Sequence, residues 1–451
     1  MTDPIAVALA GVTSALPAGE VRSGQALMAE AVAVAIRTKR HLAVQAGTGT
    51  GKTLAYLVPA ILAGQTTVVA TATKNLQDQL ASKDLPFLQQ HLDRPFSWAV
   101  LKGRSNYLCM QRLSELSAKD ATGEQLGLDG VAARAPKDEL VRLAGWASTT
   151  EVGDRAELTD EPSDLAWSAV SVSARECPGA SRCPSGDGCF AEAARLRAAQ
   201  ADVIVVNLHL YGLDLAAGGM ILPDHDVVIV DEAHQLEDIV SATSGVEITA
   251  GRFSDLARRT RGVVADDRLA AGIDDVGRIV LEALRPYRDK RLKGDLPHDL
   301  GGAIAVARGR VELVLAAARA VPSSAPDDAR ARSLRLQQSA TAVIEDLGVV
   351  EQVTSSHVVW VEGSDQAPVL RVAPLDVAGL LHDALWTRRT GVLTSATLPA
   401  RLPTRLGIPH DSEFTLEHFG EWLDGFAAEI NPGWADFNHD FGEALAYYDA
   451  A

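Results

Sequence analysis

The sequence predicts an α/β protein built on a parallel β-sheet, with two largely helical insertions. A short apolar run at 41–45 is followed by a glycine-rich loop and a helix that ends near residue 64. A second run, 227–230, consists of four β-branched residues and ends in the carboxylate of Asp231. Such strands are typical of the buried interior of a parallel sheet. Between about 238 and 355, apolar residues recur at intervals of three and four, which predicts helices.

The composition is that of an ordinary globular protein. The 451 residues are 47% apolar and 22% charged, and no run approaches the roughly 18 apolar residues of a membrane helix. Asp3 precedes the apolar N-terminal segment, where a signal peptide would carry positive charge. We therefore expect a cytoplasmic protein with no membrane partner, and length alone suggests about three domains.

The net charge of −17 is unevenly distributed. Residues 411–451 hold ten acidic residues, no lysine or arginine, and nine of the 22 aromatic residues, so residues 1–410 carry only −7. Because a whole-protein charge says little about a local groove, the acidic balance argues only weakly against a nucleic-acid partner. The composition changes abruptly near residue 410.

The glycine-rich loop has the pattern of a phosphate-binding loop, except that Ala46 replaces the first glycine of G-x-x-x-x-G-K-[ST]. Its backbone N–H groups can surround a phosphate, Lys52 can reach the β- and γ-oxygens, and the Thr53 hydroxyl can bind Mg²⁺. The alternative is a glycine-rich turn without a ligand. The expected nucleotide-binding residues are Gly47, Thr48, Gly49, Thr50, Gly51, Lys52 and Thr53.

The second half of a nucleotide site is predicted at the end of the 227–231 strand. Asp231 would bind Mg²⁺, usually through water, and Glu232 would polarise the attacking water. Alone, the string Asp-Glu-Ala-His could simply begin a helix, since aspartate is a good cap. Together with Lys52 and Thr53 it predicts a site for ATP and Mg²⁺.

The four cysteines, Cys109, Cys177, Cys183 and Cys189, all lie between these two motifs. Disulfides are not expected in a cytosolic chain, and unrelated buried thiols would not cluster at intervals of five residues. Structural zinc usually takes cysteine pairs two to four residues apart, whereas four thiolates also complete a cuboidal iron–sulfur cluster. The spacing favours iron–sulfur slightly and leaves zinc open.

The ordered motifs A-G-T-G-T-G-K-T, D-E-A-H and Leu393-Thr-Ser-Ala-Thr-Leu398 resemble the motif set of superfamily 2 helicases. The resemblance implies that Arg22 and Gln25 flank or read the adenine. It also implies that the polar residues of 69–80 touch the DNA backbone. Four further residues would couple the nucleotide to bound DNA: His234, Thr394, Ser395 and Thr397.

The cysteine segments, Lys102-Gly-Arg-Ser-Asn-Tyr-Leu-Cys109 and Cys177-Pro-Gly…Cys183-Pro…Cys189-Phe-Ala-Glu, resemble the DinG branch of the XPD-like helicases. The resemblance implies a RecA-like motor domain and a [4Fe–4S] cluster on the four cysteines. It further implies 5′-to-3′ movement on single-stranded DNA and the unwinding of forked, displaced-strand and RNA–DNA substrates. Lys102, Arg104 and Arg112 would then be phosphate contacts, or otherwise an ordinary solvated face.

The same resemblance divides the chain into segments. The motor domain would comprise 1–100, 196–237 and 373–410, with a cluster domain at 101–195 and a helical arch domain at 238–372. Helices are expected at 301–320 and 327–346, and strands at 357–361 and 369–372. Two basic runs of the arch, 258–261 and 285–293, are either DNA contacts or exposed helix faces.

The resemblance ends near residue 410, where family members continue into a second motor domain that supplies arginine fingers. The segment 411–451 has no lysine or arginine and cannot supply them. It would be foreign sequence from a truncation or frameshift, or an interaction module. The alternative to an autonomous helicase is therefore a half-motor, an ATP- and DNA-binding subunit that a separate second motor chain would complete. A smaller departure is Asn207-Leu-His209, where many relatives have Asn and His adjacent.

Overall fold

The protein is described from a computed structural model, which covers residues 4–16, 19, 22–47, 49–117, 135–399 and 401–409. These residues form two compact units. The first contains the described residues of 1–102, 195–244 and 376–409, and the second contains those of 103–194 and 245–375. The predicted acidic segment 411–451 and the predicted phosphate-loop residue Thr48 lie outside the described residues.

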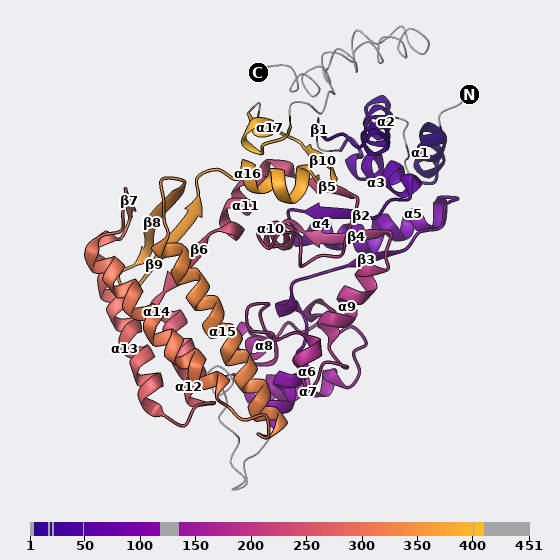
Figure 1. Cartoon of the computed structure of the whole chain (residues 1–451). Helices are drawn as coiled ribbons and strands as arrows, with labels where there is room; N and C mark the ends of the chain where they lie inside the picture. The colour runs from indigo at the N-terminus through magenta and orange to yellow at the C-terminus, as the bar shows by residue number, and fades with distance from the viewer. Residues whose placement is uncertain are drawn as a thin grey trace. The chain divides into compact units, whose positions relative to one another are not determined.

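The first unit is built on a six-stranded sheet in which every adjacent pair of strands is parallel (Figure 1). The α/β class predicted from the sequence is confirmed. In spatial order the strands are β1 (Leu42–Gln45), β10 (Thr390–Ser395), β5 (Val227–Asp231), β2 (Thr67–Thr71), β4 (Val203–Asn207) and β3 (Trp98–Val100).

The helices of the first unit cover both faces of this sheet. Helices α2 and α3 share one hydrophobic core with the strands, and α10 packs on β2 and β4. The helices are α1 (Pro4–Ser14), α2 (Ser23–Thr38), α3 (Lys52–Ala63), α4 (Lys74–Gln79), α5 (Leu85–His91), α10 (Leu208–Ala216), α11 (Leu236–Ser244), α16 (Ala378–Leu381) and α17 (Leu402–Arg405). A π-helical turn, Leu80–Asp84, joins α4 to α5, and another, His382–Trp386, follows α16.

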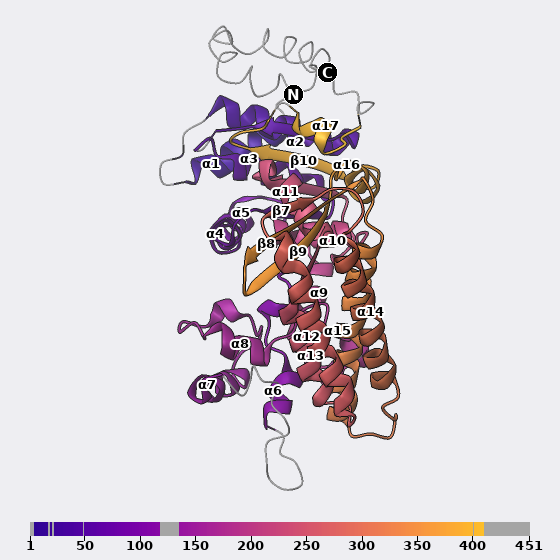
Figure 2. The same ribbon diagram turned by 90° about the vertical axis from the view of Figure 1, so that its left-hand side faces the viewer.

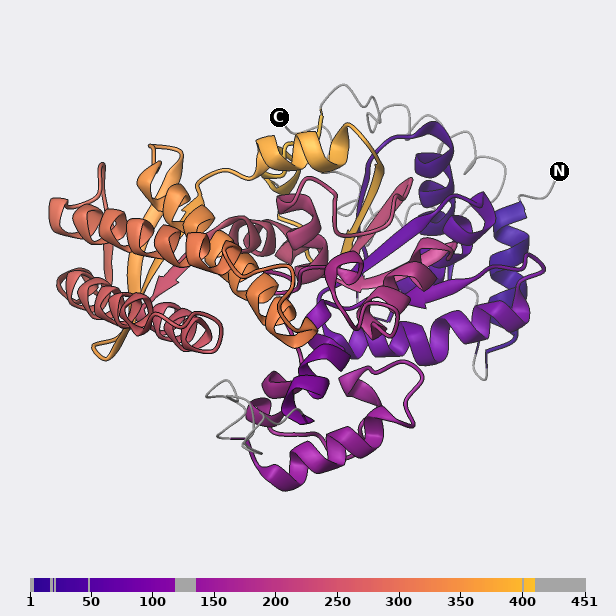
Figure 3. The same cartoon turned by 60° about the horizontal axis from the view of Figure 1, so that its bottom comes forward.

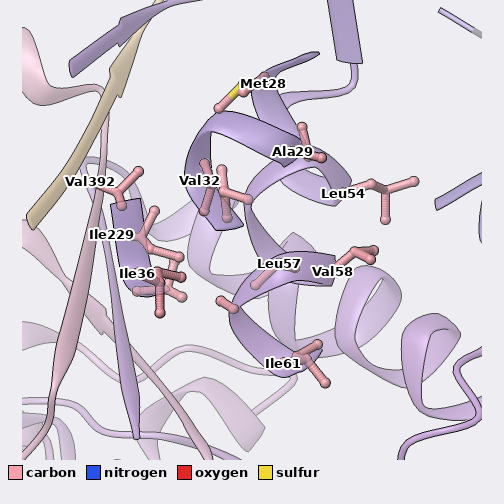
Figure 4. Close-up of a cluster of buried hydrophobic side chains, with 14 of the residues drawn as sticks. Met28, Ala29, Val32, Ile36, Leu54, Leu57, Val58, Ile61, Ile229 and Val392 are labelled. Carbon is pink, nitrogen blue, oxygen red and sulfur yellow. The ribbon is translucent and has the colours of Figure 1, made fainter. Parts of the chain in front are cut away.

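The packing of α2 and α3 against the sheet fixes the start of α3, where the phosphate loop ends. Val32 and Ile36 of α2 and Leu57 of α3 are fully or almost fully buried beside Ile229 of β5 and Val392 of β10 (Figure 4). Burying side chains of this size stabilises the fold by roughly 1.5–3 kcal/mol each. The helix ends one residue before Gly64, whose φ of +70° suits glycine.

The second unit contains two parts that the sequence analysis separated. Residues 103–194 form short helices around a small core of their own. These helices are α6 (Met110–Ser117), α7 (Lys137–Ala147), α8 (Asp164–Val170) and the start of α9 (Phe190–Ala199), with single 3₁₀ turns at Arg104–Asn106, Arg155–Glu157 and Ala180–Arg182.

Residues 245–375 form four longer helices that pack in succession (Figure 2) and a second sheet (Figure 3). The predicted helices at 301–320 and 327–346 correspond to the two longest of them. The helices are α12 (Ala250–Arg261), α13 (Asp267–Leu284), α14 (His298–Arg319) and α15 (Asp327–Glu351).

The second sheet is antiparallel, with strand order β6-β9-β8-β7. Its strands are β6 (Val246–Thr249), β9 (Ala367–Pro374), β8 (His357–Ser364) and β7 (Lys290–Leu292). The sequence predicted only β8 and β9. Part of the basic run 285–293 is the edge strand β7, whose exposed Lys290 and Arg291 are typical of charged, short edges. Residues 373–374, expected to lead back to the motor sheet, instead complete β9.

Candidate functional site: a nucleotide site and a four-cysteine pocket

The predicted nucleotide motifs follow neighbouring strands of the first unit. Strand β10 lies between β1 and β5, with Gln45 opposite Ser395 and Thr394 opposite Asp231. Parallel strands all end at the same edge of a sheet, so the loops that follow β1, β5 and β10 begin side by side. Crevices at such carboxyl ends are the usual place of ligand binding in open α/β sheets.

The phosphate loop is held from both sides. Gly49 and Gly51 have φ values of +82° and +79°, a region that L side chains rarely adopt. The Ala46 N–H donates to the Ser395 carbonyl at 2.9 Å, and the Thr50 hydroxyl donates to the Gly47 carbonyl at 2.9 Å. The backbone therefore takes the conformation in which glycine is needed at two of the three predicted positions.

The two residues expected to flank adenine also contact this loop. The Arg22 guanidinium donates to the Gly49 carbonyl, and the Gln25 amide donates to the Gly51 carbonyl at 3.0 Å. A Cβ atom on Gly51 would lie 2.2 Å from the Gln25 amide nitrogen, so a side chain here would displace the Gln25 amide. Arg22 and Gln25 therefore position the loop, a contact that sequence reasoning did not anticipate.

The charged residues of the two motifs meet. Lys52 donates to the Glu232 carboxylate at 3.1 Å and lies 3.7 Å from the Asp231 carboxylate. Asp231 is largely buried, and this burial raises the pKa of its carboxyl, an effect that the positive charge of Lys52 opposes. A further cation would stabilise the ionised form of this buried carboxylate, and the ionised form is the one that binds Mg²⁺.

Tyr56 joins the two residues predicted to bind Mg²⁺. Its hydroxyl is buried and donates to the Asp231 carboxylate at 3.2 Å, and the Thr53 side chain is close enough to influence its pKa. Burial, with the charge of Asp231 next, raises the pKa of Tyr56 well above its usual value, so the phenol stays a proton donor. Sequence reasoning missed Tyr56, although it lies one helical turn after Thr53, on the face that meets β5.

Glu232 and His234 connect this centre to β10. The Ser395 hydroxyl donates to the Glu232 carboxylate at 3.2 Å and lies 2.9 Å from the His234 imidazole. Glu232 has a φ of +61°, which is uncommon for glutamate and costs on the order of 1 kcal/mol or more. Three separate sequence motifs thus share one hydrogen-bonded network.

The other two residues of the T-S-A-T string lie differently. The Thr394 hydroxyl is fully buried and has no hydrogen-bond partner among the described residues. The Thr397 backbone N–H donates to the Ser395 hydroxyl at 3.3 Å, and no contact of its side chain is seen in the described chain. Their predicted role in coupling nucleotide to DNA stays a prediction.

The four cysteines line one pocket in the second unit, with a largely apolar wall that includes Tyr107, Leu108 and Val172. All four are free thiols, each half-buried. Among the described residues, however, no three Cys, His, Asp or Glu side chains lie close enough together to ligate a single metal ion. The pocket thus gathers four soft donors around a space, without their meeting at one point.

Charged groups surround this pocket. Burial raises the pKa of the Cys109 thiol to about 11, while the Arg112 backbone N–H and the charge of Arg335 oppose that shift. Arg104, itself partly buried, lies near Cys177, pairs with Glu192 at 3.1 Å and is also near Cys189. The predicted phosphate contact Arg104 is therefore turned toward the cysteines and Glu192.

A second pocket of this unit gathers arginines that are far apart in the sequence. Arg112 lines it together with Arg258 and Arg259 of α12, from one of the two basic runs. Two acids reduce its charge: Asp255 pairs with Arg258, and Glu176 pairs with Arg259 at 2.7 Å. The hydroxyls in its lining are those of Ser105, Ser168, Ser171 and Ser173.

Comparison with known proteins gives the family context. Residues 25–119 match the DEAD/DEAH box helicase family. The chain is 40% identical over 409 residues to the ATP-dependent helicase DinG of Mycobacterium tuberculosis, covering 86% of this chain and 61% of the relative. It is 39% identical over 241 residues to the ATP-dependent DNA helicase YoaA of Haemophilus influenzae, covering 52% and 36%.

Among solved structures, an XPD helicase matches with a TM-score of 0.50 at 14% identity, covering 86% of this chain and 61% of that one. At this identity the likeness concerns the fold alone. The chain spans about three fifths of the length of the DinG relative. No helix in the described part of the chain is long and apolar enough to cross a membrane.

Proposed function

Since the chain is a homologue of the DinG-type helicases and carries a DEAD/DEAH box helicase domain, we propose that it is an ATP-dependent DNA helicase or translocase. The observation that carries this proposal is the network formed by Lys52, Asp231, Glu232, His234 and Ser395 at the carboxyl ends of three parallel strands.

In the proposed reaction, Lys52 and the phosphate-loop N–H groups stabilise the charge that develops on the transferred phosphoryl group. Thr53 and Asp231 would hold Mg²⁺, which would neutralise negative charge on the phosphates, and Tyr56 would fix the position of the Asp231 carboxylate. Glu232 orients the attacking water. Arg22 and Gln25 hold the loop and contact the adenine.

Ser395 is the element that would report the state of the nucleotide. It hydrogen-bonds to Glu232 and His234, and it is both the last residue of β10 and the second residue of the T-S-A-T segment. A change at the γ-phosphate that moves Glu232 would therefore reach this segment through one hydrogen bond. We place the coupling between ATP hydrolysis and movement on single-stranded DNA at this contact, with 5′-to-3′ polarity taken from the family resemblance.

The four-cysteine pocket is proposed to hold a [4Fe–4S] cluster. The donor set fits: four free thiols and an apolar wall, with a different cysteine available for each iron. Such a cluster takes one thiolate at each iron, so it needs sulfurs distributed around a pocket. Cys109, Cys177, Cys183 and Cys189 would hold it, and it would supply a rigid centre to a segment that has only a small core of its own.

The arginine and serine pocket around Arg112 is the proposed contact for the DNA backbone. The pocket contains three guanidiniums and four hydroxyls. Groups of both kinds bind the phosphodiesters of DNA. Single-stranded DNA, alone or at a fork, is the proposed partner, and RNA–DNA hybrids are a further proposed substrate.

The second candidate is an ATP- and DNA-binding half-motor that does not unwind DNA alone and works with a separate second motor chain. Unwinding of forked duplexes with a single 5′ or 3′ tail separates the two. Strand displacement that needs ATP and a 5′ tail supports the helicase, whereas binding without displacement supports the half-motor.

Iron and acid-labile sulfide in anaerobically purified protein test the cluster. About four of each per chain, with a brown colour that Cys183→Ser removes, would support the proposal. Colourless protein with stoichiometric zinc would contradict it.

A further inference from the structure

A buried ion pair links the longest helix of the second unit to the four-cysteine pocket. Arg335 on α15 pairs with Glu115 on α6, and the two side chains are only 7% and 9% exposed. The residues are 220 positions apart in the sequence. Removing two charges from water is costly, so a buried pair of this kind requires close geometry and further hydrogen bonds.

Those further hydrogen bonds lead to two of the cysteine segments. Gln111 donates to the Glu115 carboxylate at 2.9 Å and to the Asp328 carboxylate of α15 at 3.1 Å. The Ser185 hydroxyl donates in turn to the Gln111 side-chain carbonyl at 2.9 Å. Helix α6 begins one residue after Cys109, and Ser185 lies two residues after Cys183, so one network holds both segments against α15.

The ion pair is separated from the wall of the pocket by a single residue. Gln111, which donates to the Glu115 carboxylate, lines the four-cysteine pocket, and so does Ser185. Arg335 thus belongs to the electrostatic surroundings of the pocket, although it comes from the helical segment 245–375.

We propose that Arg335 is a positioning residue for the four-cysteine site, which sets the charge around the cluster and thereby its reduction potential. The inference rests on the proposed [4Fe–4S] cluster. Reduction adds one electron to a centre already bound by four thiolates. A buried cation close to the pocket favours the reduced form, and a buried anion opposes it.

The test compares the two partners of the ion pair. Arg335→Gln removes the cation and leaves Glu115, so the reduction potential should fall. Glu115→Gln removes the anion and leaves Arg335, so the potential should rise. The double variant R335Q/E115Q should return close to the wild type, and Arg335→Lys should stay close to it. Redox titration followed by electron paramagnetic resonance, with iron and sulfide content, supplies the measurement.

If the ion pair only holds α15 against α6, both single variants break the same contact and should change the reduction potential in the same way. Shifts in the same direction, or no shift in either variant, would overturn the inference. Arg308→Gln is the matched control, since it breaks an exposed ion pair with Glu351 on the same helix α15. Its potential should equal that of the wild type.

Two further outcomes cover the case in which a variant, or the wild type, does not bind the cluster. If Arg335→Gln binds no iron, Glu115→Gln decides the question: a raised potential supports the inference, and an unchanged or lowered one overturns it. A wild-type protein without iron would overturn the proposed cluster itself, before any variant is compared. Failure of the cluster and failure of the role of Arg335 are therefore distinguishable.

Discussion

Lys52 lies between two carboxylates, 3.1 Å from Glu232 and 3.7 Å from Asp231. Its ammonium group balances these charges and is placed to bind the β- and γ-phosphates of ATP. The phosphates would bring further negative charge to the same place, which the ammonium of Lys52 would offset.

We predict that Lys52→Ala lowers the rate of ATP hydrolysis by about 10²-fold or more, the usual cost of removing one stabilising donor from a transition state. Circular dichroism should show an unchanged fold, since Lys52 contributes nothing to the hydrophobic core. Lys137→Ala, which removes an exposed lysine at the start of α7, is the control and should keep wild-type turnover. Unchanged turnover in Lys52→Ala would remove the phosphate-loop assignment.

The Tyr56 hydroxyl gives a prediction about pH. It donates to the Asp231 carboxylate and so stabilises the ionised form, which lowers the pKa of Asp231 against the raising effect of burial. Tyr56→Phe removes that bond, so the pKa of Asp231 should rise further. Mg²⁺ binds the ionised carboxylate. In the pH profile of the ATP hydrolysis rate at limiting Mg²⁺, the acid limb, where the rate falls at low pH, should therefore move to higher pH. An acid limb that stays in place or moves to lower pH would show that Tyr56 does not act on Asp231.

At this scale the sequence predicted most of the residues but few of their contacts. Lys52, Asp231 and Glu232 were identified from two motifs, His234 and Ser395 only through the family resemblance. All five lie in one network. A motif contains no information on partners 175 residues away, so the Tyr56–Asp231 contact was missed. The contacts of Arg22 and Gln25 with the phosphate loop depend on the register of α2 against α3, which the sequence does not reveal.

Strand β10 determines whether the elements of the nucleotide site meet. It lies between β1 and β5 and carries Ser395 to the other two motifs. Its second residue, Gly391, has no room for a side chain, because an added Cβ would lie 2.4 Å from the Trp386 ring.

We predict that Gly391→Ala lowers the free energy of unfolding by about 1–3 kcal/mol, the usual cost of overpacking. Gly379→Ala in α16 is the matched control, since nothing lies within 4 Å of the added Cβ and alanine is the better helix former. It should be neutral or slightly stabilising. Denaturant titration measures both, and equal stability of the two variants would contradict the packing described around β10.

The pocket formed by Arg112 and helix α12 gives a prediction about DNA binding. Arg112→Gln and Arg258→Gln should each weaken binding of single-stranded DNA, and each should reduce the slope of log affinity against log salt by about 0.7. Arg278→Gln on α13 is matched to Arg258→Gln, because both arginines pair with an aspartate three residues earlier. If all three variants bind alike, the pocket does not contact the DNA backbone.

At the scale of elements, the long helices and the central strands were the most predictable. Apolar periodicity predicted α14 and α15, and runs of β-branched residues predicted β5, β8 and β9. β6 and β7 were missed because each has at most four residues, and Lys290 and Arg291 of β7 look like an exposed basic run. The second sheet depends on pairing across more than 100 residues, which no local pattern contains.

For the whole molecule, one chain alternates between two units, the first of which contains the parallel sheet. The first unit carries the nucleotide network, and the second carries the cysteine pocket and the arginine pocket. The division into motor, cluster and arch segments that the family resemblance implies stays a prediction. Whether ATP turnover in one unit responds to DNA is therefore the central question about the molecule.

The most direct measurement is ATP hydrolysis by the anaerobically purified chain, with and without single-stranded DNA. Our account predicts that DNA stimulates hydrolysis several-fold or more, that Mg²⁺ is required, and that Lys52→Ala abolishes both the basal and the stimulated rate. Hydrolysis that is unaffected by DNA, or that persists in Lys52→Ala, would contradict it.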